Sequence, residues 1–267
     1  MSGDMKVEKI DEYKWLIPKH GGMKVPGMIY SDERMIKDIL KDKAPAQVVN
    51  AAYLPGIVRM SMAMPDIHWG YGLPIGGVVA TDIDDGGVIT PGGVGYDINC
   101  GVRLIRTSLQ SGDVLSRIKD LVEDLFRTVP TGVGSTGDIK LDPGAQKKIL
   151  THGAAWAVSE GYGWQSDLDN CEEGGAIPGA NPTKVSKRAY ERGSDQPGTL
   201  GSGNHFLEIQ EVSEVFREDV AKVFGLERGK IVVMIHTGSR GIGHQICTDY
   251  SASFGRSMDK WNIRVPD

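Results

Sequence analysis

A glycine-rich segment, residues 91–103 (PGGVGYDINCGVR), carries a carboxylate and a thiol three residues apart, at Asp97 and Cys100. Glycine lets the backbone turn tightly, so the two side chains can converge on one point. A carboxylate and a thiolate placed in this way form half of a metal site. Taken alone, the segment fits a capped turn with a small buried cysteine better than a metal site. The metal hypothesis therefore needs support from elsewhere in the chain.

Two further glycine-rich segments place histidines at the ends of predicted strands. Residues 198–210 (GTLGSGNHFLEIQ) bring His205 to the start of one strand, and residues 232–245 (VVMIHTGSRGIGHQ) put His236 at the end of another. Each histidine alone also fits a core position or a plain turn. Imidazole, carboxylate and thiolate in three such segments are together typical of a metal centre, and a deprotonated cysteine can bridge two divalent ions. The sequence thus predicts one divalent-metal centre built from Asp97, Cys100, His205 and His236.

Two other segments carry side chains that we place around this centre. Residues 64–77 (MPDIHWGYGLPIGG) add Asp66 and His68, which we interpret as part of the wall of the site rather than as ligands. Residues 184–193 (KVSKRAYERG) are basic, with spacings of three and four that put most of the cations on one helical face. Such a face is equally typical of a solvated surface or of a phosphate-binding surface. The candidate phosphate contacts are Lys184, Lys187, Arg188, Arg192 and, after the third segment's strand, Arg240.

The helices and strands that position these residues can be inferred from the spacing of hydrophobic residues and from the residues that begin or end such elements. Helical spacing and capping residues predict helices over residues 32–42, 113–129 (N-cap Asp113), 142–161 (N-cap Asp142), 181–193 and 246–261. Apolar runs predict strands over residues 205–212 and 230–236, the second suited to a central position. Glycine-punctuated stretches over residues 6–30 and 56–105 favour short strands and tight turns. This mixed order predicts an α+β fold, a single large domain of mixed sheets with peripheral helices over residues 1–267.

Composition excludes several classes of protein. Of the 267 residues, 40% are hydrophobic and 24% are charged, with a net charge of −5, so collagen, coiled coil and disorder are excluded. No apolar run approaches the roughly 20 residues of a membrane span, and residues 1–15 lack the apolar core of a secretory signal. The three cysteines do not form a disulfide framework. We therefore expect a cytoplasmic protein with no membrane partner.

The three metal-binding segments closely resemble the RtcB family of RNA-splicing ligases, archaeal members in particular. The resemblance runs from about Lys9 to Asp267 and includes the motifs LPGI, MPDIHWGYG, VPTGVGS and EEGG. It implies an RtcB-like fold whose C-terminal part is missing from this chain. It also implies an enzyme that joins RNA 2′,3′-cyclic phosphate or 3′-phosphate ends to 5′-hydroxyl ends, in tRNA splicing and RNA repair.

The resemblance further implies GTP and Mn²⁺ as cofactors, with two Mn²⁺ ions in a complete active site. One ion would bind Asp97, Cys100 and His205, and the other Cys100 and His236. The guanylate of GTP would contact the run Asn204, His205, Phe206, Leu207 and Glu208. The implied partners are RNA, namely tRNA exon halves and broken RNA ends. Ligand softness alone would favour Zn²⁺ at a Cys/His site.

The sequence departs from the family pattern in two motifs. A further metal-ligand histidine and the histidine that accepts GMP both lie in motifs that do not occur here, and His20, His152 and His244 lie outside any matching context. We therefore expect this chain alone to be inactive and to need a complementary C-terminal chain or segment. Two alternatives stay open: a hydrolase with Cys100 as nucleophile and a histidine as base, and a non-catalytic RNA-binding fragment.

Overall fold

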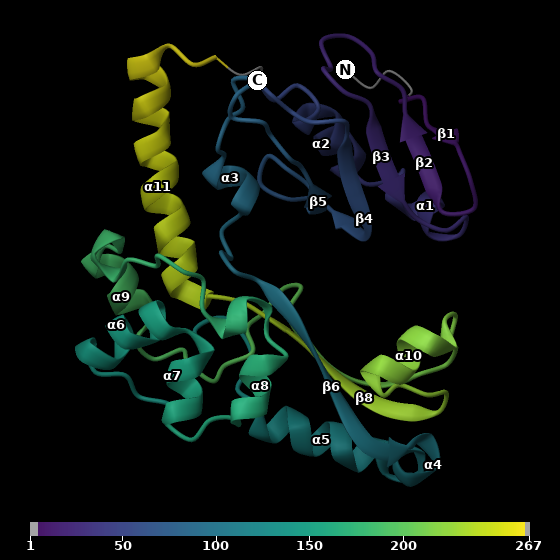
Figure 1. The fold of residues 1–267 in the computed structure, drawn as a ribbon, viewed down its shortest axis with the longest axis vertical. Coiled ribbons are helices and arrows are strands. Elements are labelled where there is room, and N and C mark those ends of the chain that lie inside the picture. Colours follow the sequence, from purple (N-terminus) through teal and green to yellow (C-terminus); the bar gives the residue numbers. More distant parts are fainter. Residues whose placement is uncertain (1–4, 265–267) are drawn as a thin grey trace. The chain divides into compact units, whose positions relative to one another are not determined.

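The computed structural model describes residues 5–264, which form two compact units (Figure 1). The first unit holds the described residues up to Gly95 and those from Cys247 onward, and the second unit is Tyr96–Ile246. Residues 1–4 and 265–267, at the ends of the predicted single domain, lie outside the described residues. The α+β class is confirmed, since two mixed or antiparallel sheets are accompanied by helices. The single ligase domain over residues 1–267 stays a prediction.

The first unit is built on a five-stranded mixed sheet. Its strands, in spatial and chain order, are β1 (Glu8–Lys9), β2 (Lys14–Ile17), β3 (Gly27–Tyr30), β4 (Ser61–His68) and β5 (Ile75–Val78). Only β3 and β4 pair in parallel, and a parallel pair needs a crossover connection. That connection contains helices α1 (Met35–Ile39) and α2 (Ala44–Ala51), which pack on the sheet around buried Ile29 and Val48. The short strands predicted over residues 6–30 and 56–105 are confirmed.

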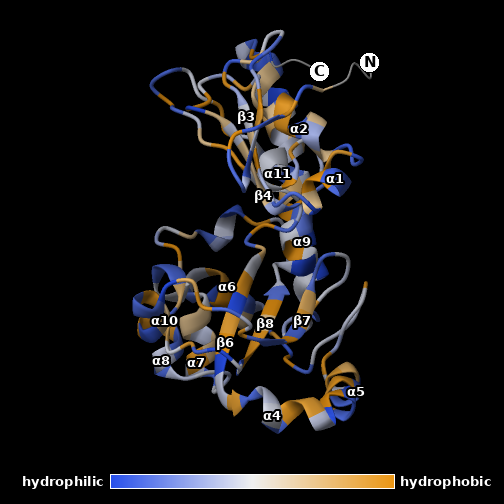
Figure 2. Cartoon of the chain, turned by 90° about the vertical axis from the view of Figure 1, so that its right-hand side faces the viewer, coloured by the Kyte–Doolittle hydropathy of each residue, from blue (hydrophilic) through white to orange (hydrophobic). Residues whose placement is uncertain are grey.

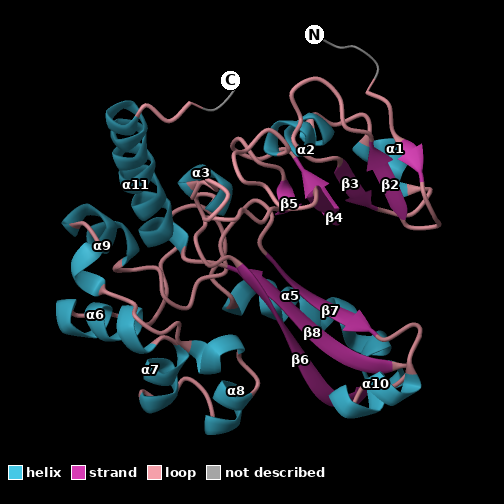
Figure 3. Cartoon of the chain, turned by 45° about the horizontal axis from the view of Figure 1, so that its top comes forward, coloured by secondary structure: helices cyan, strands magenta, loops and turns pink. Residues whose placement is uncertain are grey.

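The second unit is built on a three-stranded antiparallel sheet in the order β6-β8-β7 (Figure 3). Its strands are β6 (Gly101–Gln110), β7 (Phe206–Glu211) and β8 (Lys230–Thr237). The two strands predicted from apolar runs are confirmed, and β8 is central, paired with β6 on one side and β7 on the other. Strand β6 extends beyond the predicted stretch of short strands and lies at the edge of the sheet.

Most predicted helices of the second unit are divided by a local turn. Residues 113–129 contain parts of α4 (Ser111–Val114), η1 (Leu115–Arg117) and α5 (Ile118–Thr128). The predicted N-cap Asp113 is wrong, because this residue lies inside α4, where its carboxylate accepts the backbone N–H of Gln110 at 2.8 Å. Gln110 takes the cap position instead, and the two residues form a reciprocal capping box.

The helix predicted over residues 142–161 is interrupted at Gly153. Its N-cap is confirmed, because the Asp142 carboxylate accepts the N–H groups of Gly144 and Ala145 at 2.7 and 2.8 Å. Gly153 has φ +53°, a left-handed angle that cannot continue the helix. The break separates α6 (Pro143–His152) from α7 (Ala154–Ser159).

The helix predicted over residues 181–193 is also divided. A short turn, η3 (Pro182–Lys184), is followed by extended Val185, and helix α9 (Lys187–Gly193) begins after a Ser186 N-cap. The basic residues therefore do not all share one helical face, because Lys184 precedes the helix. The final predicted helix is confirmed but starts earlier, since α11 spans Arg240–Trp261.

Several short elements of the structure had no predicted counterpart. Besides α2, they are α3 (Pro91–Val94), α8 (Gln165–Asp169), η2 (Glu172–Gly175) and α10 (Glu218–Phe224). Hydrophobic residues recur along β6, β8 and α5 (Figure 2), yet no residue of α5 is buried. Among the described residues, no helix has the length and apolar character needed to cross a membrane.

Candidate metal centre

One end of the second unit's sheet gathers the predicted metal ligands. Strands β6 and β7 both pair antiparallel with β8, so their first residues lie beside the last residues of β8. His236 is directly opposite Val102 of β6 and Phe206 of β7. Cys100 immediately precedes β6 and His205 immediately precedes β7. Three distant parts of the sequence therefore meet at one end of the sheet.

The donor atoms of these residues form a short chain of contacts. The Cys100 sulfur lies 2.9 Å from Nε2 of His236 and 3.6 Å from Nε2 of His205. The same Nε2 of His205 lies 2.5 Å from a carboxylate oxygen of Asp97. The ligand atoms of the cysteine and the two histidines all lie within 4.8 Å of one another. The structure thus brings together all four residues, with the thiol between the two imidazoles.

A tight turn places Asp97 and Cys100 on the same side of the backbone. The N–H of Cys100 donates to the carbonyl of Asp97 at 2.9 Å, and Asn99 adopts φ +62°. Asparagine tolerates this left-handed angle better than most residues. The carboxylate of Asp97 also accepts a hydrogen bond from the Ser239 hydroxyl at 3.3 Å. The alternative of a turn capped by Asp97 around a buried cysteine is therefore wrong, because the Asp97 backbone carbonyl closes the turn and Cys100 is exposed.

Two glycines let the backbone approach the ligands closely. A Cβ atom at Gly238 would lie 2.2 Å from a carboxylate oxygen of Asp97, and one at Gly201 would lie 1.9 Å from Nδ1 of His205. Both distances are far below van der Waals contact. The high glycine content of the sequence signalled such close approach, but it did not identify these two positions. They support the ligands without supplying a donor atom.

The His205 imidazole is enclosed and acts through one nitrogen. Its side chain is only 6% exposed. Its Nδ1 atom is buried and has no hydrogen-bond partner among the described residues, whereas Nε2 faces both Asp97 and Cys100. His236 is held differently, because the Phe206 ring packs edge-on against it with a centroid distance of 5.2 Å. Both rings are therefore fixed with Nε2 toward the sulfur.

Electrostatics keep the Cys100 thiol neutral in the absence of a cation. The residue as a whole is exposed, but partial burial of its sulfur, together with the hydrogen bond and negative charge of Asp97, raises the pKa of the thiol to about 12. A divalent cation would offset the carboxylate and favour the thiolate. The donor set, one sulfur, two imidazole nitrogens and a carboxylate, fits such an ion.

The same electrostatics argue against Cys100 as a free nucleophile. The nucleophile of a cysteine hydrolase is the thiolate, which such enzymes stabilise by lowering the pKa of the thiol. Here burial of the thiol, followed by the hydrogen bond and charge of Asp97, raises its pKa to about 12. The His236 imidazole is close enough to act as a base, at 2.9 Å, but the thiol would remain almost wholly protonated at neutral pH. The geometry therefore favours a metal centre.

The run predicted to contact guanylate lies at the start of β7. Phe206 packs on His236, and Glu208 shares its face of the strand, since alternate residues point to the same side. Asn204 and Glu208 are exposed, whereas Leu207 is half-buried and lies opposite Ile235. The run is therefore adjacent to the metal ligands, and its guanylate contacts stay a prediction.

The side chains predicted to contact phosphate differ in their exposure and in the partners that they already have within the protein. Lys187 and Arg188 are exposed and lie 3.8 and 3.6 Å from the Glu191 carboxylate. Arg192 instead donates to the Gln245 side chain at 3.0 Å. Arg240, at φ +53°, donates to the Thr199 hydroxyl and to a backbone carbonyl, at 3.2 and 3.0 Å. The last two arginines therefore hold loops together within the protein.

Asp66 and His68 belong to β4 of the first unit. The Nδ1 atom of His68 lies 2.7 Å from the backbone carbonyl of Asp66, and the Asp66 carboxylate packs against Gly76. The role of both residues as a wall of the site stays a prediction.

Comparison with known proteins identifies relatives along almost the whole chain. Residues 47–267 match the family model described as "tRNA-splicing ligase RtcB". The chain is 50% identical over 262 residues to the tRNA-splicing ligase RtcB of Thermococcus kodakarensis, covering 98% of this chain and 54% of that protein. It is 51% identical to the Archaeoglobus fulgidus protein of the same name, covering 100% of this chain and 55% of the relative. The RNA-splicing ligase RtcB of Mycobacterium tuberculosis is 52% identical over 83% of this chain and 52% of its own length. The chain spans about half the length of the curated relatives it matches.

Metal affinity should depend on pH through the Cys100 proton. Because the thiol is protonated below its pKa of about 12, binding of an ion must release one proton, and affinity should rise about tenfold per pH unit above the range in which histidines titrate. Calorimetric titration with Co²⁺ at several pH values measures this slope. Cys100→Ser should lose both the slope and most of the affinity, whereas Cys171→Ser should retain both. A pH-independent affinity would contradict thiolate ligation.

Gly238→Ala should weaken metal binding without unfolding the protein. The added Cβ would meet the Asp97 carboxylate at 2.2 Å, so the carboxylate must shift, and displacement of a supporting contact typically lowers metal affinity about 10- to 100-fold. The matched control is Gly112→Ala, whose Cβ would meet nothing within 4 Å. Calorimetry measures affinity, and thermal melting without metal measures folding. Equal affinity in the two variants would show that Gly238 does not position Asp97.

Proposed function

The chain belongs to the tRNA-splicing ligase RtcB family, and we propose that it supplies the metal-binding part of a cytoplasmic RNA ligase. The ligase joins RNA 2′,3′-cyclic phosphate or 3′-phosphate ends to 5′-hydroxyl ends, with GTP and Mn²⁺ as cofactors. Its substrates are tRNA exon halves and broken RNA ends. The expected resemblance to this family is confirmed, and the activity of the whole enzyme is our proposal.

The observation that carries the proposal is the position of the Cys100 sulfur between two imidazoles. One Mn²⁺ would be held by Asp97, Cys100 and His205, and the other by Cys100 and His236, with the thiolate shared. The contact distances support this division, because Asp97 touches His205 and the sulfur touches both histidines. Two divalent ions at such a site supply in-line placement of nucleophile and leaving group and neutralise charge on phosphoryl oxygens.

The protein's own residues prepare the site for that chemistry. The Asp97 carboxylate and the Cys100 thiolate bring two negative charges to a partly enclosed place, which a divalent cation can balance. The Ser239 hydroxyl holds the carboxylate at 3.3 Å. Asn204, Phe206 and Glu208 flank the histidines at the start of β7, where they can hold the guanylate. The exposed Lys187 and Arg188 side chains would contact RNA phosphates.

The choice of Mn²⁺ comes from the family rather than from the donor atoms. Soft sulfur and imidazole ligands bind Zn²⁺ more tightly than Mn²⁺, and the order of affinities is the same at most protein sites. The Asp97 carboxylate and the phosphate oxygens of a bound substrate are hard ligands, which suit Mn²⁺. We therefore expect Zn²⁺ to compete for the site, and Mn²⁺ to occupy it where Zn²⁺ is scarce.

A further segment of polypeptide should complete the ligase. Strand β6 exposes apolar side chains along its length, namely Val102, Leu104, Ile105 and Leu109. Phe126 of the amphipathic helix α5 is 78% exposed. Apolar surface of this extent marks an interaction site. We propose that it packs against a complementary C-terminal chain or segment of the kind that the longer relatives contain, which would also supply the acceptor of GMP.

The chain alone should bind RNA ends weakly without becoming guanylylated. The motif with the GMP-accepting histidine does not occur in it, and a poorly held second ion loses the in-line geometry. Incubation with radiolabelled GTP and Mn²⁺, followed by denaturing electrophoresis, tests for covalent GMP. Addition of the C-terminal part of the Thermococcus kodakarensis relative should produce labelling that Cys100→Ser abolishes.

Two results of that experiment would contradict the proposal in different ways. A labelled band on the isolated chain would mean that one of His20, His68, His152 or His244 accepts GMP. Retained RNA binding with no labelling under any combination of segments would favour the alternative of a non-catalytic RNA-binding fragment.

A further inference from the structure

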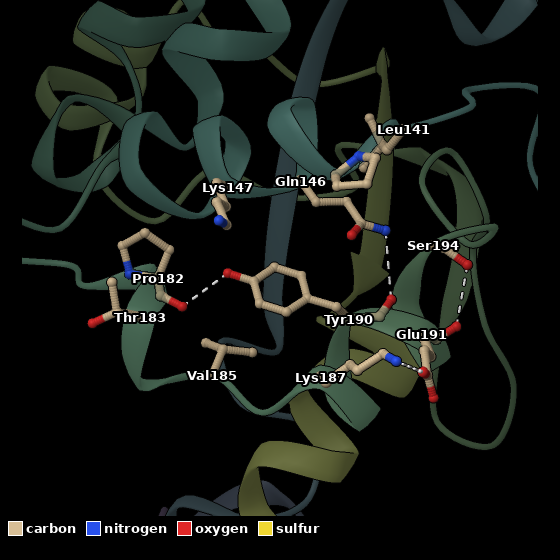
Figure 4. A pocket seen from close by; sticks show the side chains of 11 residues that line it. Leu141, Gln146, Lys147, Pro182, Thr183, Val185, Lys187, Tyr190, Glu191 and Ser194 are labelled. Atoms are coloured by element: carbon tan, nitrogen blue, oxygen red, sulfur yellow. Dashed lines mark hydrogen bonds and ion pairs between the residues drawn. The ribbon is translucent and has the colours of Figure 1, made fainter.

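A pocket separate from the metal ligands lies between α6 and α9 of the second unit (Figure 4). Its volume is about 640 Å³, which is within the usual range for small-molecule sites. Its wall is largely apolar and includes Leu141, Pro143, Pro182, Val185 and the ring of Tyr190. A wall made of aliphatic side chains, proline rings and one aromatic ring can accept a planar ring.

The Tyr190 ring is fixed in place across this pocket. Its hydroxyl donates to the backbone carbonyl of Pro182 at 2.9 Å, so the ring joins α9 to the turn that precedes it. Figure 4 shows the ring extending from α9 toward Pro182, between Val185 and the side of α6 that carries Gln146. Because its hydroxyl is already bonded to the protein, the ring offers a ligand its face rather than its polar end. An aromatic face held in this way is a stacking surface.

The rim of the pocket carries an excess of positive charge. Lys147 of α6 and Lys187 of α9 both line it, and the Lys187 side chain is 92% exposed. The rim also includes the Glu191 carboxylate, which lies 3.8 Å from the Lys187 ammonium and 3.6 Å from the Arg188 guanidinium. Two lysines and one carboxylate therefore line the rim, and that carboxylate is also paired with Arg188 just outside it. A ligand with an apolar ring and negatively charged flanks is complementary to this arrangement.

The helix that carries Tyr190 and the residues that follow it are anchored to the first turn of α11, which begins at Arg240. After α9, the Gln196 side chain accepts the N–H of Gly241 at 2.7 Å, and Thr199 accepts a hydrogen bond from Arg240 at 3.2 Å. Gly193 itself packs directly against Ile242. The first turn of α11 follows directly on Gly238 and Ser239, which contact Asp97, so consecutive residues of the chain contact both regions.

We propose that this pocket binds one unpaired base of single-stranded RNA, stacked on Tyr190, with the flanking phosphates at Lys147 and Lys187. The inference rests on the proposed function, since it names a subsite for the RNA substrate. The Gln146 Nε2 atom donates to the backbone carbonyl of Tyr190 at 3.5 Å, which leaves the amide oxygen and the second N–H for the edge of the base. A stacked base adds affinity that does not depend on salt, whereas the lysines add affinity that does.

Fluorescence anisotropy with a short single-stranded RNA ending in a 2′,3′-cyclic phosphate tests the subsite on the full chain. Tyr190→Ala should weaken binding about 5- to 150-fold with an unchanged slope of affinity against salt. Lys187→Ala should instead reduce that slope by about 0.7. Tyr190→Phe keeps the ring and should keep the affinity. The matched controls are Tyr162→Ala, an aromatic that is 57% exposed in the same unit, and Lys119→Ala.

Photocrosslinking provides a second measurement that does not depend on the stability of a variant. RNA carrying 5-iodouridine should crosslink to the wild-type chain at the peptide that contains Tyr190. Binding that Tyr190→Ala leaves unchanged, or crosslinks that map only elsewhere, would overturn the subsite and leave the proposed ligase function intact. A wild-type chain with no affinity for RNA at low salt would overturn both.

Discussion

The antiparallel pairing of β8 with β6 and β7 is the constraint on which the metal centre depends. It places the first residues of β6 and β7 beside the last residues of β8, at one end of the sheet. Cys100, His205 and His236 meet there, although more than a hundred residues of sequence separate Cys100 from either histidine. A slip of one residue in β8 would turn His236 to the opposite face of the sheet. The ladders of β8 with β6 and with β7, paired in register from Thr237 to Val232 and from His236 to Ile231, oppose that slip.

The negative charge on Asp97 affects the protonation of the Cys100 thiol at this end of the sheet. Partial burial of the sulfur, together with the hydrogen bond and charge of this carboxylate, raises the pKa of the thiol to about 12, so a proton and the proposed metal ion would compete for one atom. The same carboxylate is positioned by the Ser239 hydroxyl and by close packing against Gly238. In the proposed RNA ligase, which would handle highly charged phosphoryl groups, this arrangement would favour cations at the site and keep the sulfur neutral without them.

Local signals predicted much of the local structure, and one predicted helix failed where a contact from elsewhere in the chain intervened. The Asp142 cap and strands β7 and β8 follow from residue types and periodicity within a few positions. The helix expected over residues 142–161 breaks at Gly153, where the carbonyl of Gly175 would lie 2.0 Å from an added Cβ. Helix α2 has a Pro near its start and an Asp42 carboxylate that accepts the Ala44 N–H. That capping signal was present in the sequence, although we predicted no helix there.

The sequence by itself determined the types of ligand, the turns that present them and the family. These depend on residues that are neighbours in the chain, such as Asp97, Asn99 and Cys100. Only the tertiary structure decided which ligands touch, that Gly201 and Gly238 pack against them, and that Tyr190 closes one side of a pocket. The physical reason is that periodicity specifies which face of an element is buried but not its partner. Strand pairing and close packing are set by the free energy of the whole folded unit.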